Sequence, residues 1–328
     1  MVKSAALLFV CVSAPMFGGT LFIGAGPGGG PQVNSYNDSS LVLNGSFFGF
    51  TPIFTGGVSV AASNGTVVVG SGAGTAPTVN LFNDQTFVST GSFAPFAPAF
   101  TGGVTVAAGD GVIVAGAGPG GGPQVNVYDA NTLALTAAFF AFPVSFTGGV
   151  SVAESGHHIV VGGGSGGASK VSVFSDLGTS IGSFFAFNPL YQSGISVAAG
   201  DGKIVVGGGS GSAPEVKIFD ATTFNLLGDF FAFTPSVQTG VSVAIGDGEI
   251  AVGLLSGGSP EVRIFDENTL VQEGDFLAFA PSFQGGTSVA LEAAQVAPPP
   301  PPSSVPEPAV GLLVALGLAG VVVWRRRA

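Results

Sequence analysis

Cysteine and histidine are scarce in this 328-residue chain. The single cysteine, Cys11, lies in an N-terminal apolar run, so the body of the chain can form no disulfide and no thiolate metal site. The two histidines, His157 and His158, are neighbours, and side chains at adjacent positions of a strand point to opposite faces. We therefore expect these histidines to mark a polar turn and no metal site.

Charge, and positive charge above all, is also scarce. Charged residues make up 8% of the chain and the net charge is −11, whereas about 25% of the residues of ordinary soluble domains are charged. Of the eight cations, Lys3 lies near one end and Arg325–Arg327 lie at the other. The remaining four are Lys170, Lys203, Lys217 and Arg263. Because nucleic-acid binding needs a basic patch, we expect no nucleic-acid partner.

No convincing helical pattern occurs between residues 20 and 290, and this affects how the glycine-rich phrase GAGPGGGPQVN is read. At residues 24–34 its first six letters match the dinucleotide-binding turn G-x-G-x-x-G, which needs a helix directly after it. The alternating stretch Pro31–Tyr36 follows instead and favours a strand. The same eleven letters return at residues 116–126. We interpret the phrase as a connector in a repeated unit and predict no cofactor.

A five-residue segment, Gly-Val-Ser-Val-Ala in its commonest form, recurs six times in register. The copies begin at Gly57, Gly103, Gly149, Gly194, Gly240 and Gly286, with offsets of 46, 46, 45, 46 and 46 residues. A glycine-rich composition alone would not keep such a register. The chain is therefore predicted to be built from six structural repeats.

Each complete repeat carries four β signals, which fall at 195–199, 203–207, 215–219 and 226–233 in the copy around Gly194. Asp201-Gly202 joins the first two signals and is a strong hairpin turn, because both turn positions need a positive φ. Four antiparallel strands every 46 residues predict an all-β fold, a six-bladed β-propeller of four-stranded antiparallel blades. We expect the phenylalanine-rich fourth signals to pack between blades and not to form a ligand cage. The phenylalanine-rich stretches of these signals begin at Phe47, Phe139, Phe184, Phe230 and Phe276.

The sixth repeat stops after Ser288–Leu291, without its second strand. Near the N-terminus, Gly19–Gly24 matches Gly65–Gly70, which is the second-strand segment of another repeat. We predict that this N-terminal strand completes the last blade and so closes the ring without an exposed sheet edge.

The two ends of the chain resemble targeting segments. The start has a basic residue, an apolar run and a small-residue triplet ending at Ala14, which is typical of a signal peptide. The C-terminal end joins a Pro-Glu-Pro triplet, the apolar run 309–324 and three arginines. That run has 16 residues, close to the roughly 17–25 of a single transmembrane helix. The predicted segments are a signal peptide at 1–14, the propeller at 15–295, a proline-rich linker at 296–305 and the tail with its helix at 306–328.

The order of triplet, apolar run and basic cluster resembles the PEP-CTERM sorting signal. In that family the tail directs export and is processed at the inner membrane by an exosortase, in bacteria that typically make exopolysaccharide. By this resemblance the sorting residues are Pro306, Glu307, Pro308, Arg325, Arg326 and Arg327. The alternative is a plain membrane anchor, which has the same topology, with the propeller outside, but is not processed.

The repeats Gly116–Asp129 and Ser145–Ala153 resemble FG-GAP-type propeller repeats, which occur in integrin α-subunit heads and in bacterial surface proteins. Many members of that family hold calcium in an Asp-x-Asp/Asn-x-Asp-Gly loop between the first and second strands. The turns here carry one carboxylate each, at Asp110, Asp201 and Asp247, whereas calcium takes about six to eight oxygen ligands. We therefore predict no metal residues.

No order of acid, base and nucleophile typical of an enzyme stands out, so no catalytic residues are predicted. The turn aspartates are explained by turn chemistry, and Glu215 and Glu261 are interpreted as solvated positions. The sequence predicts an exported, non-catalytic structural or interaction propeller that is tethered to the inner membrane before exosortase processing. We expect it to act afterwards in the cell envelope or the exopolysaccharide matrix. A glycan-binding, lectin-like module and a polysaccharide-acting enzyme remain as alternatives.

Overall fold

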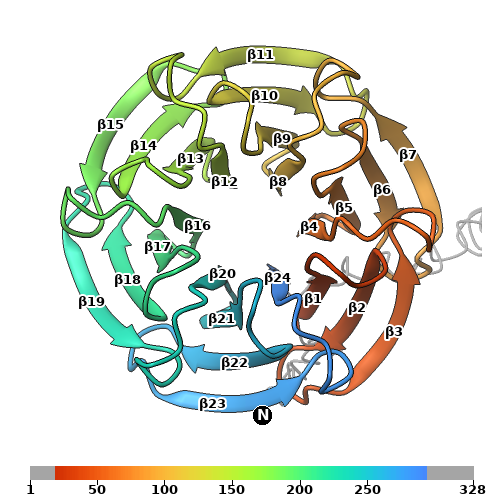
Figure 1. Cartoon of the computed structure of the whole chain (residues 1–328), viewed down its shortest axis with the longest axis vertical. Coiled ribbons are helices and arrows are strands. Elements are labelled where there is room, and N and C mark those ends of the chain that lie inside the picture. Colours follow the sequence, from red (N-terminus) through yellow and green to blue (C-terminus); the bar gives the residue numbers. More distant parts are fainter. Residues whose placement is uncertain (1–18, 294–328) are drawn as a thin grey trace, which may run out of the picture. The chain divides into compact units, whose positions relative to one another are not determined.

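In the computed structural model, residues 19–293 are described and form a ring of six four-stranded antiparallel sheets (Figure 1). This confirms the predicted six-bladed β-propeller. Listed from the axis outward, blades 1 to 3 are β24 (Thr287–Glu292), β1 (Thr20–Ala25), β2 (Gln32–Asn37), β3 (Leu43–Phe48); β4 (Val58–Ser63), β5 (Thr66–Ser71), β6 (Val79–Asn83), β7 (Ser89–Phe93); and β8 (Val104–Gly109), β9 (Val112–Ala117), β10 (Gln124–Asp129), β11 (Leu135–Phe140). Blades 4 to 6 are β12 (Val150–Ser155), β13 (His158–Gly163), β14 (Lys170–Ser175), β15 (Ser180–Phe185); β16 (Ile195–Gly200), β17 (Lys203–Gly208), β18 (Glu215–Asp220), β19 (Leu226–Phe231); and β20 (Val241–Gly246), β21 (Glu249–Leu254), β22 (Glu261–Asp266), β23 (Gln272–Leu277).

The turns between the first two strands of the blades have the predicted backbone conformation. Asp201 and Gly202 both have positive φ, at 52° and 71°. Asp110-Gly111 and Asp247-Gly248 repeat this pattern. The two-residue turn matches the right-handed twist of the strands that it joins, which explains why aspartate and glycine recur at this place.

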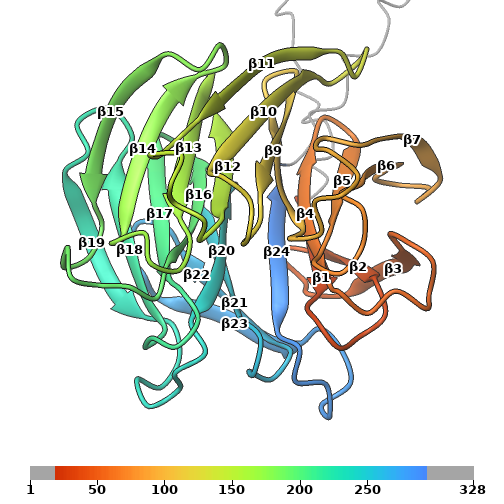
Figure 2. The same ribbon diagram turned by 45° about the horizontal axis from the view of Figure 1, so that its top comes forward.

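The ring closes as the sequence predicted. β1 pairs with β24 on one side and with β2 on the other, and Ile23 lies opposite Val289 in the first of these ladders. Figure 2 shows β24 beside β1, although the two strands come from opposite ends of the described chain. Residues from both ends thus share the hydrogen bonds of blade 1, so the ring keeps no terminal sheet with an exposed face.

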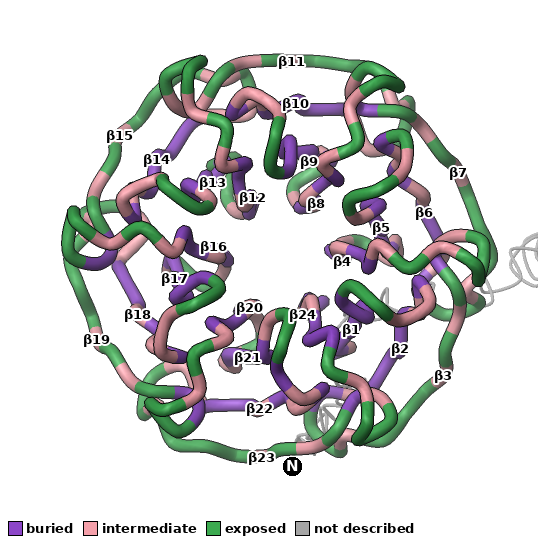
Figure 3. The backbone as a smooth tube through the Cα atoms, viewed as in Figure 1, coloured by how far each residue is buried: buried purple, intermediate pink, exposed green. Residues whose placement is uncertain are grey.

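The core lies between the blades and not within any one of them, because each sheet covers the face of its neighbour. Valines of β10 in blade 3 pack with Val150, Val152 and Ile159 of blade 4 in one such cluster. Figure 3 shows the buried residues along the two central strands of every blade, with exposed residues along the outermost strands. A blade therefore depends on both neighbours for the burial of its apolar residues.

The phenylalanine-rich segments confirm the prediction in part. The first aromatic residue of each outer-strand segment packs against an aromatic residue of the next blade, with ring centroids 4.4–4.7 Å apart. These pairs are Phe47–Phe82, Phe93–Tyr128, Phe139–Phe174, Phe184–Phe219, Phe230–Phe265 and Phe276–Tyr36. The next residue in each segment does not pack between blades, since alternate side chains of an outer strand point outward. Phe140, for example, is 53% exposed.

The predicted targeting segments cannot be placed in this fold. The signal peptide, the sorting residues and the apolar run 309–324 lie outside residues 19–293. Within that range, there is no helix with the length and apolar character needed to span a membrane.

Candidate functional site

The inner strands of the six blades surround a cavity of about 470 Å³ on the axis of the ring. Apolar residues from all six strands line it. A hydroxyl side chain also lines the cavity at the second position of each inner strand: Ser59, Thr105, Ser151, Ser196, Ser242 and Ser288. Among the described residues that line the cavity, Glu154 is the only charged one. Four further hydroxyl side chains line the cavity, Ser165, Ser193, Ser210 and Thr287, so any chemistry in the channel depends on these eleven polar side chains.

The six hydroxyl groups form a closed ring of contacts between blades. Three of them accept a hydrogen bond from a backbone N–H of the next blade: Ser288 from Val60, Ser59 from Val106 and Ser151 from Val197, at 3.1–3.2 Å. The other three donate to a backbone carbonyl of the next blade: Thr105 to Val150, Ser196 to Val241 and Ser242 to Thr287, at 2.6–2.8 Å. Every junction between blades thus has one such bond, which occupies an inner-edge backbone group that the sheet itself leaves unpaired.

This hydroxyl ring was not predicted from the sequence, although its signal is visible there. Serine or threonine fills the third position of all six copies of the repeated Gly-Val-Ser-Val-Ala segment. Alternation along a strand shows that these side chains share one face, but it does not show which groups of the next blade they meet. Their hydrogen bonds to the backbone give them a structural role, and none of them is paired with a histidine.

Glu154 breaks the six-fold pattern. The fifth position of the inner strand is alanine in blades 2, 3 and 5, isoleucine in blade 6 and leucine in blade 1. In blade 4 it is Glu154, which is 6% exposed and whose two carboxylate oxygens accept no hydrogen bond from the described residues. The carboxylate lies over Gly109 of blade 3, where a Cβ atom would collide with it. The absence of a side chain at Gly109 therefore makes room for Glu154.

The surroundings of Glu154 keep its carboxyl protonated near neutral pH. Burial, followed by the negative charges of Asp110 and Asp176, raises its pKa to about 8, and nearby His157 offsets part of this rise. His157 itself lies at the turn, with its Nδ1 2.8 Å from Asp176 Oδ2, and this contact raises the pKa of the imidazole. Both histidines were predicted to occupy a polar turn: His157 does, whereas His158 is the first residue of β13. His157 also belongs to an acidic cluster that the sequence did not reveal.

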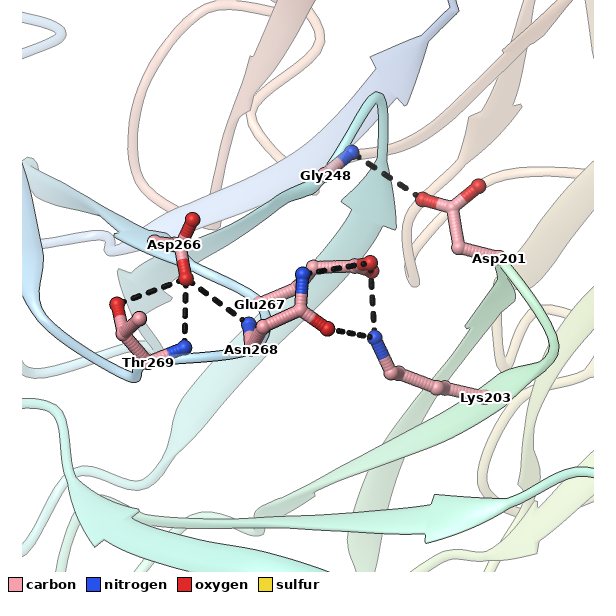
Figure 4. A network of polar contacts seen from close by, with 7 residues as sticks. All are labelled: Asp201, Lys203, Gly248, Asp266, Glu267, Asn268 and Thr269. Carbon is pink, nitrogen blue, oxygen red and sulfur yellow. Dashed lines mark hydrogen bonds and ion pairs between the residues drawn. The ribbon is translucent and has the colours of Figure 1, made fainter.

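Contacts between blades also join the loops at the end of the ring that holds the turn of His157, as Figure 4 shows for blades 5 and 6. Lys203 Nζ lies 2.8 Å from Glu267 Oε1 of the next blade and donates to Asn268 Oδ1 at 2.9 Å. Asp201 Oδ2 accepts a hydrogen bond from the N–H of Gly248 at 3.3 Å. The turn aspartates thus act beyond their own turns, because they also hold the neighbouring blade.

The matching junction between blades 6 and 1 has an acid in place of the lysine. Glu249 is the first residue of β21, as Lys203 is of β17. Burial, followed by the negative charges of Asp38, Glu273 and Asp247, raises the pKa of Glu249 to about 7. Repulsion among carboxylates therefore replaces attraction at this junction.

Glu215 and Glu261 were predicted to be solvated, and the structure confirms this only in part, because each also forms an ion pair on its own strand. Glu261 Oε1 lies 2.7 Å from a guanidinium nitrogen of Arg263, and Glu215 Oε1 lies 3.5 Å from Lys217 Nζ. The glutamate side chains are only 25% and 30% exposed. Residues two apart on a strand share a face, so the Glu-x-Arg and Glu-x-Lys spacings already contained this signal.

The remaining motifs do not assemble a reactive centre within the described residues. No group of three or more His, Cys, Asp or Glu side chains among residues 19–293 is placed to hold a metal ion. The two glycine-rich phrases lead into strands β2 and β10, and no helix follows either of them. The G-x-G-x-x-G spacing would suggest a pyrophosphate bound at the N-terminus of a helix, but neither phrase leads into a helix.

Known proteins match the two parts of the chain separately. The family model described as the PEP-CTERM protein-sorting motif matches residues 304–327. This segment includes the Pro-Glu-Pro triplet and the three arginines that were predicted as the sorting signal. No curated protein sequence matches the chain.

Solved structures resemble the propeller in fold alone. TolB from Acinetobacter baumannii is 13% identical, with a TM-score of 0.57 over 84% of this chain and 67% of that one. A protein of unknown function from Bacteroides caccae is also 13% identical, with a TM-score of 0.57 over 84% of this chain and 98% of that one. The resemblance to FG-GAP repeats is compatible with this fold and stays a prediction. The chain thus carries a PEP-CTERM sorting motif at residues 304–327, which follow a six-bladed β-propeller in the sequence.

Proposed function

We propose that this protein is a non-catalytic scaffold of the cell envelope or of the exopolysaccharide matrix. The sorting motif implies an exported protein that an exosortase processes, with the chain anchored in the inner membrane beforehand. The propeller would be the part that acts after processing. The match to the sorting motif is the observation that carries this proposal.

The use of polar side chains in the propeller supports a scaffold. Each of the six hydroxyls at the second position of the inner strands already bonds the neighbouring blade, and the turn carboxylates Asp201 and Glu267 also make contacts between blades. A catalytic group needs a reactive partner within hydrogen-bond reach. The six hydroxyls of this ring, which could otherwise serve as nucleophiles in the channel, thus contribute to the stability of the propeller.

The sorting step can be tested in the native host by following the fate of the tail. Glu307→Ala changes the triplet, and Ser303→Ala, in the segment before it, is the matched control. We expect the wild type and the control to reach the envelope or extracellular fraction in a shortened form. The Glu307→Ala chain should stay in the inner membrane at full length. Full-length protein in the cytosol, or normal shortening of the Glu307→Ala chain, would contradict the proposal.

The non-catalytic role has its own test. Purified protein incubated with the exopolysaccharide of its host should leave the length distribution of that polymer unchanged, as judged by size-exclusion chromatography. Shortening of the polymer that persists through purification would favour the enzyme alternative. A glycan-binding propeller is the second candidate, and an uncharged cavity between blades 6 and 1 specifically favours it.

A further inference from the structure

The glycine-rich phrase that occurs at residues 24–34 and again at 116–126 builds the same structure in blades 1 and 3. Gln32 Nε2 donates to Asn34 Oδ1 at 2.8 Å, and Gln124 Nε2 donates to Asn126 Oδ1 at 3.0 Å. Each asparagine then donates to a carbonyl of the preceding blade at 2.7 Å. The phrase thus fixes a pair of amide side chains at two junctions between blades.

Two phenylalanines from the preceding blade stand beside each amide pair. Phe279 and Phe283 meet edge to face, with ring centroids 5.6 Å apart, beside blade 1. Phe96 and Phe100 do the same at 5.8 Å beside blade 3. A Cβ atom on Gly29 would come within 2.8 Å of the Phe283 ring, so the glycine lets the aromatic ring approach bare backbone.

A cavity of about 240 Å³ lies between these elements at the junction of blades 6 and 1. Its lining includes Gly30, Gln32, Asn34, Phe279 and Phe283, and none of its lining residues is charged. The bond to Asn34 fixes the amide of Gln32, and the carbonyl oxygen of Gln32 accepts no hydrogen bond from the described residues. The cavity therefore combines an apolar wall with an oriented amide that can still accept a hydrogen bond.

We propose that this cavity, and the matching amide pair and phenylalanines at blade 3, each bind one sugar unit of a neutral polysaccharide. A sugar ring has apolar C–H faces and hydroxyl edges, which match an aromatic wall and an amide. Charged ligands such as phosphates or ammonium groups would find no counter-charge in the lining. The cavity is smaller than the roughly 300–1,000 Å³ of pockets for drug-sized ligands, which suits one sugar ring.

Blades 5 and 6 show how the same position can be closed to such a ligand. In blade 6, Arg263 replaces the asparagine, pairs with Glu261 and lies 4.5 Å from the centroid of the Phe233 ring. In blade 5, Lys217 lies 5.1 Å from the Phe187 ring. A cation thus covers the aromatic face in both blades. The glutamine–asparagine pair occurs only in blades 1 and 3 of the described ring.

Two equivalent sites on one ring can hold two sugar units of the same polymer chain. Binding at the first site raises the effective concentration of polymer at the second, which increases overall affinity well beyond that of one site. This inference extends the proposed function, because a matrix scaffold has to hold polymer.

Native gels that contain a neutral polysaccharide can measure this binding for the full-length protein in detergent. Dextran, pullulan and galactomannan serve as probes, and anionic alginate is the charged control. We expect at least one neutral polymer to retard the wild type and alginate not to. Gln32→Ala combined with Gln124→Ala should raise the apparent Kd at least tenfold, and either single change should have a smaller effect. Thr78→Ala, at the equivalent position of blade 2, is the matched control and should bind like the wild type.

A second variant tests the cavity by filling it. A Cβ atom on Gly29 would point at the ring of Phe283 and at Ala25, which both line the cavity, so Gly29→Leu places its side chain in the cavity between blades 6 and 1. It should weaken retardation as much as Gln32→Ala does. The inference is overturned if no neutral polymer retards the protein, if alginate alone does, or if the double glutamine variant binds like the wild type. Those results would leave the sorting experiment unaffected, whereas failure of sorting would leave polymer binding measurable.

Discussion

Replacement of Glu154 by glutamine should stabilise the propeller in alkaline solution. The carboxyl of Glu154 has its pKa raised from 4.5 to about 8 by burial and by nearby acids. The unfolded chain therefore ionises this group more readily than the folded chain does. Its contribution to stability is complete below pH 4.5 and is lost as the pH rises to about 8.

The size of the effect follows from the pKa. A change from 4.5 to about 8 corresponds to roughly 5 kcal/mol, at about 1.4 kcal/mol for each pH unit. Removing one partner of a buried ion pair, which leaves an uncompensated charge, typically costs about 3–5 kcal/mol. We expect Glu154→Gln to have a free energy of unfolding about 2–5 kcal/mol above that of the wild type at pH 9. Near pH 4.5 the two proteins should be nearly equal.

Urea unfolding followed by circular dichroism between pH 4.5 and pH 9 measures this difference. Asp229→Asn removes an exposed carboxylate from an outer strand and is the matched control. Its stability relative to the wild type should change little with pH. The reasoning is refuted if Glu154→Gln gains no stability at pH 9, or if its gain is the same throughout the range.

Three further predictions concern contacts between blades. Gly109→Ala should destabilise the protein, because the added Cβ atom collides with the carboxylate of Glu154. The same change should be tolerated in a chain that also carries Glu154→Ala. Unfolding of the two single variants and the double variant tests this coupling, and additive losses of unfolding free energy would contradict it. Thr105→Val should cost about 1–3 kcal/mol of unfolding free energy, because the carbonyl of Val150 loses its hydrogen-bond donor. An unchanged urea midpoint would contradict a stabilising role of the hydroxyl ring. Phe139→Ala should cost about 3–5 kcal/mol, whereas the half-exposed Phe140→Ala should cost far less; equal losses in thermal unfolding would refute packing between blades.

The sequence predicted the fold because its strongest signals are local and repeated. Asp201-Gly202 defines a turn by its backbone requirement alone, and the same turn recurs in register along the chain. The match of Gly19–Gly24 to a second-strand segment was sufficient to predict the closure of the ring. These inferences need only the contacts within one blade and the count of blades.

Contacts between blades were harder to predict, because they depend on which residues of two repeats meet. Glu154 lies over Gly109, Ile245 over Gly200 and Leu291 close to Gly246. A larger residue at the fifth position of one inner strand thus faces glycine at the sixth position of the preceding strand. The sequence contains both members of each pair, but their offset becomes meaningful only when the packing of neighbouring blades is known.

The intact mass of the exported protein tests the central claim most directly, because it reports both ends of the chain. The account predicts a mature form that begins before Thr20, so that β1 is kept, and that ends before Arg325, so that the basic cluster is removed. An exported form that lacks β1 would contradict closure of the ring by the N-terminal strand. An exported form that still ends in the three arginines would contradict processing at the sorting motif.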